Sequence, residues 1–354
     1  MLLTGHTGFK GSWLALWLHS LGARVSGYAL APPTQPNNFS AARVAEVLAA
    51  SYEANLLDRA ALKAAVRATE PRVILHLAAR TVVRESYRDP VDTFETNVIG
   101  TVQLLDVVRE LARPCAVVVV TSDKCYHNDE SGRRLGEDEP MGGFDPYSAS
   151  KGAAEIATAS YCHSYFDPAK LERHGIAVAT ARAGNVVGGG DWTPDGLVAD
   201  SMRALLADQP IHIRNPAAIR PWQHVLEPLS GYLTLAARLL GPDAARYCGG
   251  WNFGPDASDD ATVREVVERL LRAWGEGRWI DGSRPGELHE AGVLRLENRK
   301  ARETLGWRPA WRLDEAIERT ARWFASYRRD PSRAREACLA DIAAHMSART
   351  GTKA

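Results

Sequence analysis

Residues 4–11 read TGHTGFKG, and this stretch decides the fold. Gly5, Gly8 and Gly11 stand three residues apart, between a short apolar run and a helical segment that we expect over residues 11–21. Glycines at this spacing permit a tight turn and let a pyrophosphate approach the N-terminus of the helix. A plain strand–turn–helix is the alternative. The strand before the motif and the helix after it favour a dinucleotide-binding site.

The end of the second expected strand bears on which dinucleotide binds. About 20 residues after the glycines, a carboxylate commonly holds the ribose of NAD, but this chain has Leu30 and Ala31 there. No arginine stands at the same place to hold the 2′-phosphate of NADP. We expect NAD, although no ribose-binding acid decides the choice.

The rest of the N-terminal half alternates β-rich runs with helical segments. Strands are expected at 23–30, 72–79, 116–122 and 176–188, and helices at 59–70, 93–111 and 147–166. This alternation is typical of a doubly wound, parallel α/β sheet of the Rossmann type. After Gly190 the rhythm loosens, with helices near 262–274 and 313–328, which indicates a smaller C-terminal substrate-binding domain.

We therefore expect three parts along the chain. Residues 1–186 would form the NAD-binding domain, with a contribution from about 215–247. Residues 187–338 would mainly bind substrate, and 339–354 would be a C-terminal tail, helical with a frayed end.

Composition excludes several classes of function. The 354 residues carry 43 basic and 43 acidic side chains, so no electrostatic footprint points to nucleic acid or an anionic membrane. Five dispersed cysteines without a C-x-x-C pair fit a reducing compartment and no metal site. No apolar run reaches the roughly 18 residues of a membrane span. We expect a soluble, cytoplasmic, globular protein.

Two stretches carry candidate chemistry. Tyr147 and Lys151 stand four apart, on one face of the helix expected at 147–166. A phenol is a useful base near neutral pH only if its pKa falls from about 10, and a neighbouring ammonium group would lower it. In VVVVTSDKCY, residues 117–126, a buried strand ends at Ser122, Asp123 and Lys124. The acid and the amine suggest catalysis; a loop salt bridge is the alternative.

The motifs together resemble a known family. TGxxGxxG, HLAA at 76–79, TN at 96–97, Y-x-x-x-K and ARAGNVVGGGDW at 181–192 are similar to the extended short-chain dehydrogenase/reductases that act on nucleotide sugars. GHTGFKGSWL at 5–14, VTSDKCY at 120–126, DPYSASK at 145–151 and RPWQHVLEPLSGYL at 220–233 resemble the CDP-glucose 4,6-dehydratase branch. The resemblance runs from Gly5 to about Cys338.

This resemblance implies an NAD-dependent lyase that converts CDP-D-glucose to CDP-4-dehydro-6-deoxy-D-glucose and water. Tyr147 would take the proton of the sugar 4-hydroxyl while hydride leaves C4, Ser122 would bind the developing carbonyl, and Lys151 would hold the nicotinamide ribose. Lys124 would then remove the C5 proton and Asp123 would protonate the leaving 6-hydroxyl. The dTDP- and GDP-sugar branches commonly carry Asp-Glu at this pair, and the CDP-glucose branch carries lysine.

The resemblance also supplies the binding residues. Asn55 stands where the family often has an aspartate that bonds adenine. The cofactor set is Gly5, Thr7, Gly8, Phe9, Lys10, Gly11, Asn55, Leu56, Leu77, Ala78, Ala79, Asn97, Thr121, Tyr147 and Lys151. The substrate set is Asn185, Arg214, Arg220 and Arg284, of which Arg220 is the strongest candidate for a diphosphate contact. No metal is expected. The helices around 96–112 and 147–166 would pair in a homodimer, or within a homotetramer.

Three alternatives stay open. A nucleotide-sugar 4-epimerase shares the Ser-Tyr-Lys set but needs no elimination pair, so Asp123 and Lys124 argue against it. A 4,6-dehydratase for another nucleotide hexose differs only in base recognition, which the residues do not specify. A silent NAD-binding protein would have no reason to keep Ser122, Tyr147 and Lys151 together.

Overall fold

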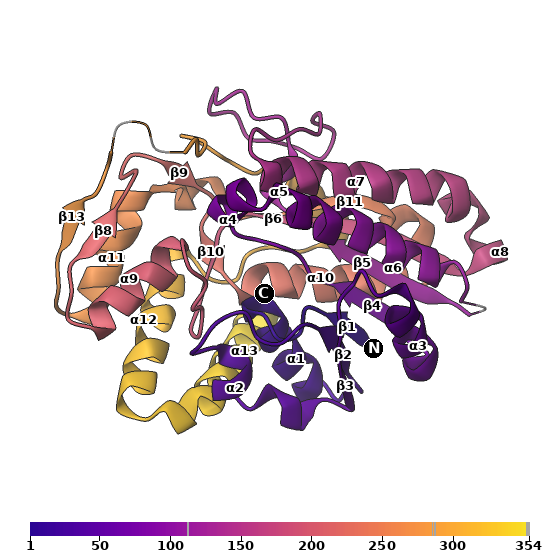
Figure 1. Ribbon diagram of the computed structural model, residues 1–354, viewed down its shortest axis with the longest axis horizontal. Helices are drawn as coiled ribbons and strands as arrows, with labels where there is room; N and C mark the ends of the chain where they lie inside the picture. The colour runs from indigo at the N-terminus through magenta and orange to yellow at the C-terminus, as the bar shows by residue number, and fades with distance from the viewer. Residues whose placement is uncertain (112, 285, 287, 352–354) are drawn as a thin grey trace.

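The computed structural model describes residues 1–111, 113–284, 286 and 288–351. Within these residues the central feature is one parallel sheet of seven strands, in the order β11-β6-β5-β4-β1-β2-β3 (Figure 1). The strands are β1 (Leu2–Thr4), β2 (Ser26–Ala29), β3 (Ala50–Glu53), β4 (Val73–His76), β5 (Cys115–Val120), β6 (Ile176–Ala183) and β11 (Gly249–Phe253). The predicted doubly wound α/β fold is confirmed.

Helices cover both faces of the sheet. On one face lie α3 (Arg59–Thr69), α6 (Gly100–Val108) and α7 (Pro146–Tyr165); on the other lie α1 (Phe9–Ser20) and α10 (Leu226–Leu239) (Figure 1). Strand β5 contributes side chains to the core on both faces. Val117 and Val119 pack on the side of α3 and α6, and Ala116, Val118 and Val120 pack on the side of α1 and α10. Because both faces are buried, the strand is apolar throughout rather than alternating.

Two local features differ from the sequence expectation. The helix expected at 93–111 is divided into α5 (Pro90–Phe94), a π-helical turn at Glu95–Ile99, and α6. A methyl group at Gly100 would lie 3.1 Å from the side chain of Leu56, so a tertiary contact lies where the helix changes geometry. Strand β3 was not expected. It is the edge strand, and its residues alternate between partly buried and exposed.

The C-terminal part forms a smaller unit beyond the carboxyl end of β6, on the left in Figure 1. Its helices are α9 (Leu197–Leu206), α11 (Val263–Trp274) and α12 (Leu313–Arg329), of which α11 and α12 confirm the two expected helices. Short strand pairs hold it together: β8 (Ile211–Ile213) with β13 (Trp279–Asp281), β9 (Ile219–Arg220) with β12 (Ala261–Thr262), and β7 (Val186–Val187) with β10 (Gln223–His224).

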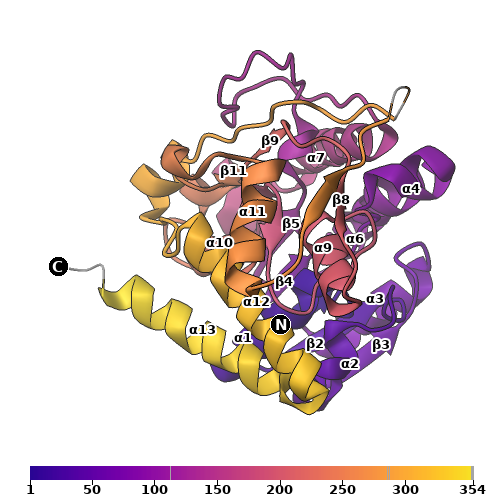
Figure 2. The same ribbon diagram turned by 90° about the vertical axis from the view of Figure 1, so that its left-hand side faces the viewer.

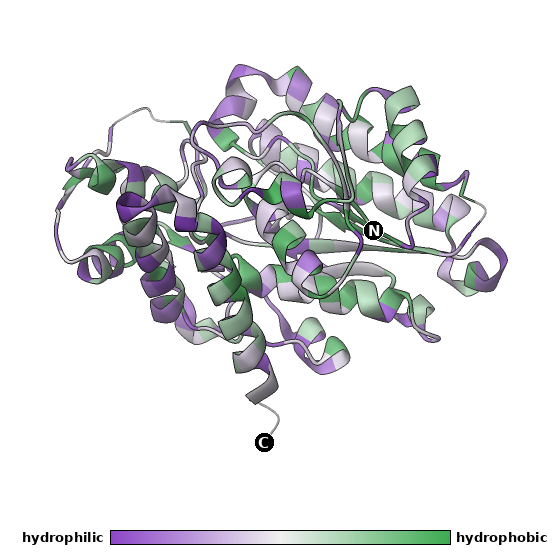
Figure 3. Ribbon diagram, turned by 90° about the horizontal axis from the view of Figure 1, so that it is seen from below, coloured by the Kyte–Doolittle hydropathy of each residue, from purple (hydrophilic) through white to green (hydrophobic). Residues whose placement is uncertain are grey.

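The last helix, α13 (Ala334–Gly351), returns to the first domain and lies against α1 and α12 (Figure 2). Cys338, Ile342 and His345 are buried on it, and His345 Nε2 lies 3.1 Å from the buried Glu227 Oε1. Seen from below, the helices mix hydrophilic and hydrophobic residues along their length (Figure 3). Among the described residues, no helix has the length and apolar character needed to cross a membrane.

Candidate active site

The three glycines of the first loop differ in what surrounds them. Gly5 has φ +74°, and a methyl group there would lie 2.7 Å from the Ala78 nitrogen. A methyl group at Gly11 would lie 2.1 Å from the Gly5 oxygen. At Gly8 it would meet nothing closer than the Gly5 oxygen at 3.5 Å. Gly5 and Gly11 are therefore required by packing, whereas Gly8 leaves room at the N-terminus of α1 that suits a pyrophosphate.

The loop is tied to the strands beside it. Thr7 Oγ1 donates to the Leu30 carbonyl oxygen at 2.9 Å. The Ala78 nitrogen donates to Thr4 Oγ1 at 3.2 Å, which holds the segment 77–79 against the end of β1. Phe9 is partly buried against the core. The loop after β2 carries Leu30 and Ala31, of which Leu30 is half exposed.

The remaining expected cofactor residues are spread along the same sheet edge. Asn55 is exposed after β3, and its Oδ1 accepts a hydrogen bond from the Leu57 nitrogen at 3.0 Å. Leu56 is buried beneath Gly100. Asn97 is buried: it accepts from the Arg80 nitrogen at 2.7 Å and donates to Ser150 Oγ at 2.8 Å. Asn97 thus joins the loop after β4 to α7 and positions the site through these contacts.

The end of β5 and the start of α7 bring the candidate catalytic residues together. Ser122 Oγ donates to Asp123 Oδ1 at 3.0 Å and accepts from the Lys124 nitrogen at 3.2 Å. Asp145 caps α7 by accepting from the Ser148 nitrogen at 2.9 Å, so the helix begins just before Tyr147. Tyr147 and Lys151 are both buried on this helix.

The pKa of Tyr147 moves against the sequence expectation. Burial raises the pKa of the phenol, and a hydrogen bond with Ser122 offsets only part of this shift. Burial and the charge of Lys10 lower the pKa of Lys151 to about 8. The expected lowering of the tyrosine pKa relied on Lys151 together with a cationic nicotinamide ring, and it stays a prediction; in the protein alone, burial has the largest effect on this pKa.

The pKa values of Asp123 and Lys124 shift in opposite directions. Burial raises the pKa of the Asp123 carboxyl, and burial together with the charge of Arg220 lowers the pKa of the Lys124 amine. Their charged atoms lie beyond the 4.0 Å of an ion pair, and Asp123 Oδ2 has no hydrogen-bond partner among the described residues. A methyl group at Gly184 would lie 3.0 Å from that oxygen. The two groups therefore lie side by side at the end of β5 without forming a close ion pair.

Lys10 connects the glycine loop to this pair. It lies in the first turn of α1, and burial lowers its pKa to about 8, against the opposing charges of Asp123 and Asp191. Burial raises the pKa of Asp191. Asp191 follows the three glycines of the GGGDW stretch, and sequence reasoning did not single it out.

A saturated polar network lies beneath the site. Arg182 donates to both carboxylate oxygens of Glu155 at 2.8 Å and to the Tyr126 hydroxyl at 2.7 Å. Thr121 Oγ1 donates to Glu155 Oε1 at 2.5 Å, so the residue before Ser122 is fixed by the same carboxylate. Sequence reasoning missed this network. Its signal was an arginine inside the buried, apolar strand β6.

Arginines of the C-terminal unit approach the site from the other side. Arg220 is buried, and its charge acts on both Asp123 and Lys124. Arg214 donates to Asp195 Oδ1 at 2.8 Å. Arg84, on α4 (Val83–Arg88), lies 3.9 Å from the same oxygen and was not singled out from the sequence.

The other two expected substrate residues differ in position. Asn185 is partly buried after β6, and its carbonyl accepts from the Gln223 nitrogen at 3.1 Å. Arg284 is exposed after β13 and makes no hydrogen bond or ion pair with the other described residues.

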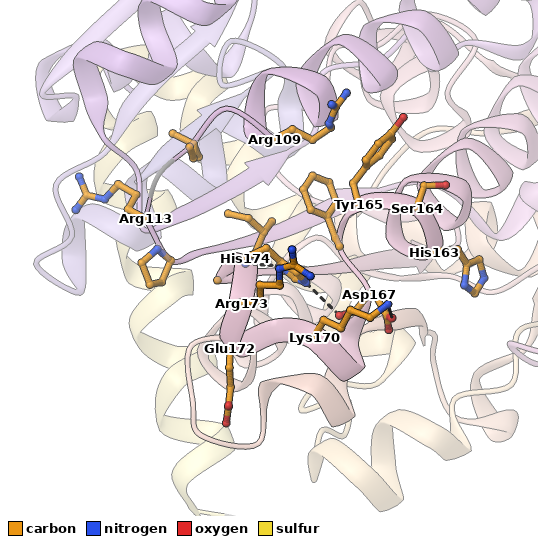
Figure 4. A pocket seen from close by; sticks show the side chains of 15 residues that line it. Arg109, Arg113, His163, Ser164, Tyr165, Asp167, Lys170, Glu172, Arg173 and His174 are labelled. Atoms are coloured by element: carbon orange, nitrogen blue, oxygen red, sulfur yellow. Dashed lines mark hydrogen bonds and ion pairs between the residues drawn. The ribbon is translucent and has the colours of Figure 1, made fainter.

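Two of the cavities on the described surface are candidates for the active site. One, of about 290 Å³, is lined by residues that include Lys124, Asp145, Phe144 and Glu290. The other, of about 750 Å³, lies at the far ends of α6 and α7, where Figure 4 shows Arg109, Tyr165 and His174. Ligands of doubly wound sheets bind outside the carboxyl ends of the strands. The smaller cavity, beside Lys124, is therefore the candidate active site. Among the described residues, no cluster suited to a metal ion occurs.

Comparison with known proteins agrees with this geometry. Residues 2–234 match the family model described as GDP-mannose 4,6 dehydratase. The chain belongs to this family of extended short-chain dehydrogenase/reductases. It is 46% identical over 329 residues to a CDP-glucose 4,6-dehydratase of Salmonella typhimurium, covering 92% of this chain and 90% of the relative.

Other similar proteins span two activities. A UDP-glucose 4-epimerase of Mycolicibacterium smegmatis is 29% identical, covering 91% of this chain and 97% of the relative. The structure of a dTDP-glucose 4,6-dehydratase from Streptomyces venezuelae with NAD bound has a TM-score of 0.74 and 25% identity, covering 93% of this chain and 97% of that one.

Proposed function

We propose that the protein is an NAD-dependent CDP-glucose 4,6-dehydratase, which converts CDP-D-glucose to CDP-4-dehydro-6-deoxy-D-glucose and water. The observation that carries this proposal is the pair Asp123 and Lys124. An acid with a raised pKa and an amine with a lowered pKa lie beside Ser122 at one strand end. An epimerase has no step that requires such a pair. The 46% identity to a CDP-glucose 4,6-dehydratase supports CDP-glucose over other nucleotide hexoses.

The glycine loop fits the pyrophosphate of NAD, because Gly8 leaves space at the N-terminus of α1. When bound, NAD would supply the hydride acceptor for C4 of the sugar and the hydride donor for C6. Lys151, one helical turn from Tyr147, would hold the nicotinamide ribose, and Lys10 would contribute a second positive charge near Asp123.

Oxidation at C4 requires a base for the 4-hydroxyl proton. Tyr147 would accept this proton, and Ser122 would donate a hydrogen bond to the developing carbonyl oxygen. Since burial raises the pKa of Tyr147, the phenolate needs nearby positive charge. Lys151 and a cationic nicotinamide ring would supply it.

Elimination follows because the new carbonyl acidifies the C5 hydrogen. The neutral amine of Lys124 would take the C5 proton, and the protonated carboxyl of Asp123 would give its proton to the 6-hydroxyl, which leaves as water. When hydride returns to C6, Lys124 would return its proton to C5. Ser122 contacts both Asp123 and the phenol, so the proton gained by Tyr147 can pass to Asp123 and restore both groups. The reaction consumes no cofactor.

Mass spectrometry of product mixtures tests this proposal. Purified protein with NAD would be incubated separately with CDP-, dTDP-, GDP- and UDP-linked hexoses. Loss of one water from CDP-glucose alone is the expected result. Loss of water from another nucleotide hexose would change the assigned substrate. No loss of water from any of the four, with NAD bound, would overturn the dehydratase assignment.

We also propose how the chain is organised. Residues 1–186, with about 215–247, would bind the cofactor, and α10 packing on β5 and β6 supports the second segment. Residues 187–338 would mainly bind the nucleotide sugar, with 339–354 as a tail that begins within α13. A cytoplasmic location is supported by the five cysteines, which are all free.

A homodimer is proposed from exposed apolar residues on neighbouring helices. Val91 on α5, Ile99 on the π-helical turn, and Ile156 on α7 are 66%, 46% and 61% exposed. The same helices of a second copy would cover them, and two such dimers could form a tetramer. Ile156→Glu should give monomers in size-exclusion chromatography with light scattering. Ile280→Glu, at an exposed apolar residue on β13, is the matched control and should leave the oligomer intact.

A further inference from the structure

Residues 288–294 of the C-terminal unit form a segment that we call the strap. It crosses the loop at residues 126–130, which follows the turn Asp123–Cys125. The Gly292 nitrogen donates to Glu130 Oε2 at 2.9 Å, and Asn128 Nδ2 donates to the Val293 carbonyl oxygen at 2.8 Å. These bonds hold the strap beside the cavity that contains Lys124. The strap therefore borders the entrance to the candidate active site.

Glu290 on this strap lies among basic side chains. Its Oε1 lies 3.7 Å from Arg84 Nε and 3.8 Å from Arg214 Nη2. Burial lowers the pKa values of Lys124 and Arg220, and the charge of Glu290 opposes both shifts. These basic residues come from α4, from the residue after β8, from the turn Asp123–Cys125 that follows β5, and from β9. One carboxylate thus lies where basic groups from four separate elements converge.

The contacts of Glu290 supply charge without hydrogen bonds. Both distances to guanidinium nitrogens exceed the 3.5 Å limit of a hydrogen bond. Asp195, in contrast, accepts a hydrogen bond from Arg214 at 2.8 Å. The planar guanidinium fork suits phosphate oxygens better than a distant carboxylate. The contacts of Glu290 with Arg84 and Arg214 are therefore long ones that a better anion can replace.

We propose that Glu290 stands in for the diphosphate of the substrate: it balances the cation cluster before a nucleoside diphosphate binds and is displaced by it. The inference rests on the proposed function, which supplies a diphosphate with two negative charges. It assigns Arg84 and Arg214, with Arg220, to the diphosphate subsite. The same carboxylate would compete with the product, which carries the same diphosphate, and would thereby favour its release.

The charge of Glu290 is tested by calorimetric titration of CDP and of CDP-glucose into Glu290→Gln. Because a competing anion is removed, the dissociation constants should fall about two- to fivefold, the range for partly exposed ion pairs. Glu290→Asp keeps the charge and should bind as the unaltered protein does. Glu297→Gln is the matched control, since Glu297 lies in the next few residues and its carboxylate accepts from the Arg299 nitrogen instead. NAD affinity should not change in any of them.

Three results would overturn the inference. Weaker binding by Glu290→Gln would mean that Glu290 contacts the ligand. Unchanged binding would mean that its charge does not compete. Equal tightening by Glu290→Asp would mean that the substitutions loosen the strap.

Failure of the proposed function is distinguishable in the same titrations. UDP, dTDP and GDP are titrated alongside CDP. If one of them binds in place of CDP, the assigned base is wrong and the Glu290→Gln effect should appear with that ligand. If none binds, inorganic pyrophosphate is the probe, and absence of tightening in Glu290→Gln overturns the stand-in role.

Discussion

The substitution Lys124→Met tests one step of the proposed reaction, the removal of the C5 proton, separately from the other steps. The substitution removes the proposed base and suits a buried site, because methionine is apolar and of similar length. General bases contribute about 10²–10⁴ to rate. Lys124 is the largest opposing charge that lowers the pKa of Asp123, so its removal raises that pKa further and favours the protonated carboxyl. Since the acid stays functional, dehydration should slow by about 10²–10⁴-fold.

The assay follows deuterium at C5 when the reaction runs in heavy water. The unaltered protein should place solvent deuterium at C5 of the product, and Lys124→Met should do so slower by the same factor as product formation. The pH profile adds a second test. Only the neutral amine is a base and only the protonated carboxyl is an acid, so the rate should have a bell-shaped dependence on pH. Lys124→Met should lack the limb that reports the titration of Lys124.

Two further variants make the result decisive. Lys170→Met removes an exposed lysine outside the site and should keep full activity. Lys124→Arg keeps the positive charge but cannot act as a base, so it should be as slow as Lys124→Met. An active Lys124→Arg, or a Lys124→Met that keeps more than about a tenth of the rate, would refute the assignment of Lys124 as the base.

Three other predictions follow from the same geometry. Gly8→Ala should weaken NAD binding with little change in urea denaturation, whereas Gly11→Ala should destabilise the fold by about 1–3 kcal/mol, because its methyl group would lie 2.1 Å from a carbonyl oxygen; equal denaturation midpoints would contradict this. Arg182→Met leaves the Glu155 carboxylate buried without its cation, so denaturation should show a loss of about 3–5 kcal/mol, and adding Glu155→Gln should recover part of it. Lys151→Met should stabilise the cofactor-free protein at neutral pH by up to about 3 kcal/mol, because the folded-state pKa of Lys151 falls from 10.5 to about 8. That cost of burying the charge disappears as pH rises from 8 to 10.5, so the two denaturation curves should converge in alkali.

The sheet could be predicted because its strands are marked by local pattern. The four valines of β5 form a short apolar run with polar residues after it, and burial on both faces requires that pattern. Strand β3 has no such mark, since an edge strand is only half buried. The π-helical turn at Glu95–Ile99 lies beside the packing of Gly100 on Leu56, a contact between residues distant in sequence. Local pattern does not contain that information.

The candidate site also contains residues that the sequence predicts and residues that only the fold reveals. Ser122, Tyr147 and Lys151 occur in short motifs, which can be recognised in the sequence without knowledge of the fold. Arg84 and Glu290 have no motif, and among many arginines a single one carries little signal. They become visible only when α4 and the strap are placed at the same entrance.

Two neighbouring groups of buried charge lie around the end of β5, and they differ in how fully they are hydrogen-bonded. Both carboxylate oxygens of Glu155 are hydrogen-bonded, by Arg182 and by threonine hydroxyls. In the group above it, Asp123 Oδ2 has no partner among the described residues, and Lys124 lies outside ion-pair distance of it. A saturated pair holds its protons and its geometry, so it can only position other groups. An unsaturated pair, with pKa values moved toward each other by burial, retains the capacity to exchange protons with a bound sugar. In the mechanism that we propose, this difference in hydrogen bonding, rather than the presence of charge, separates the reactive groups from the groups that position them.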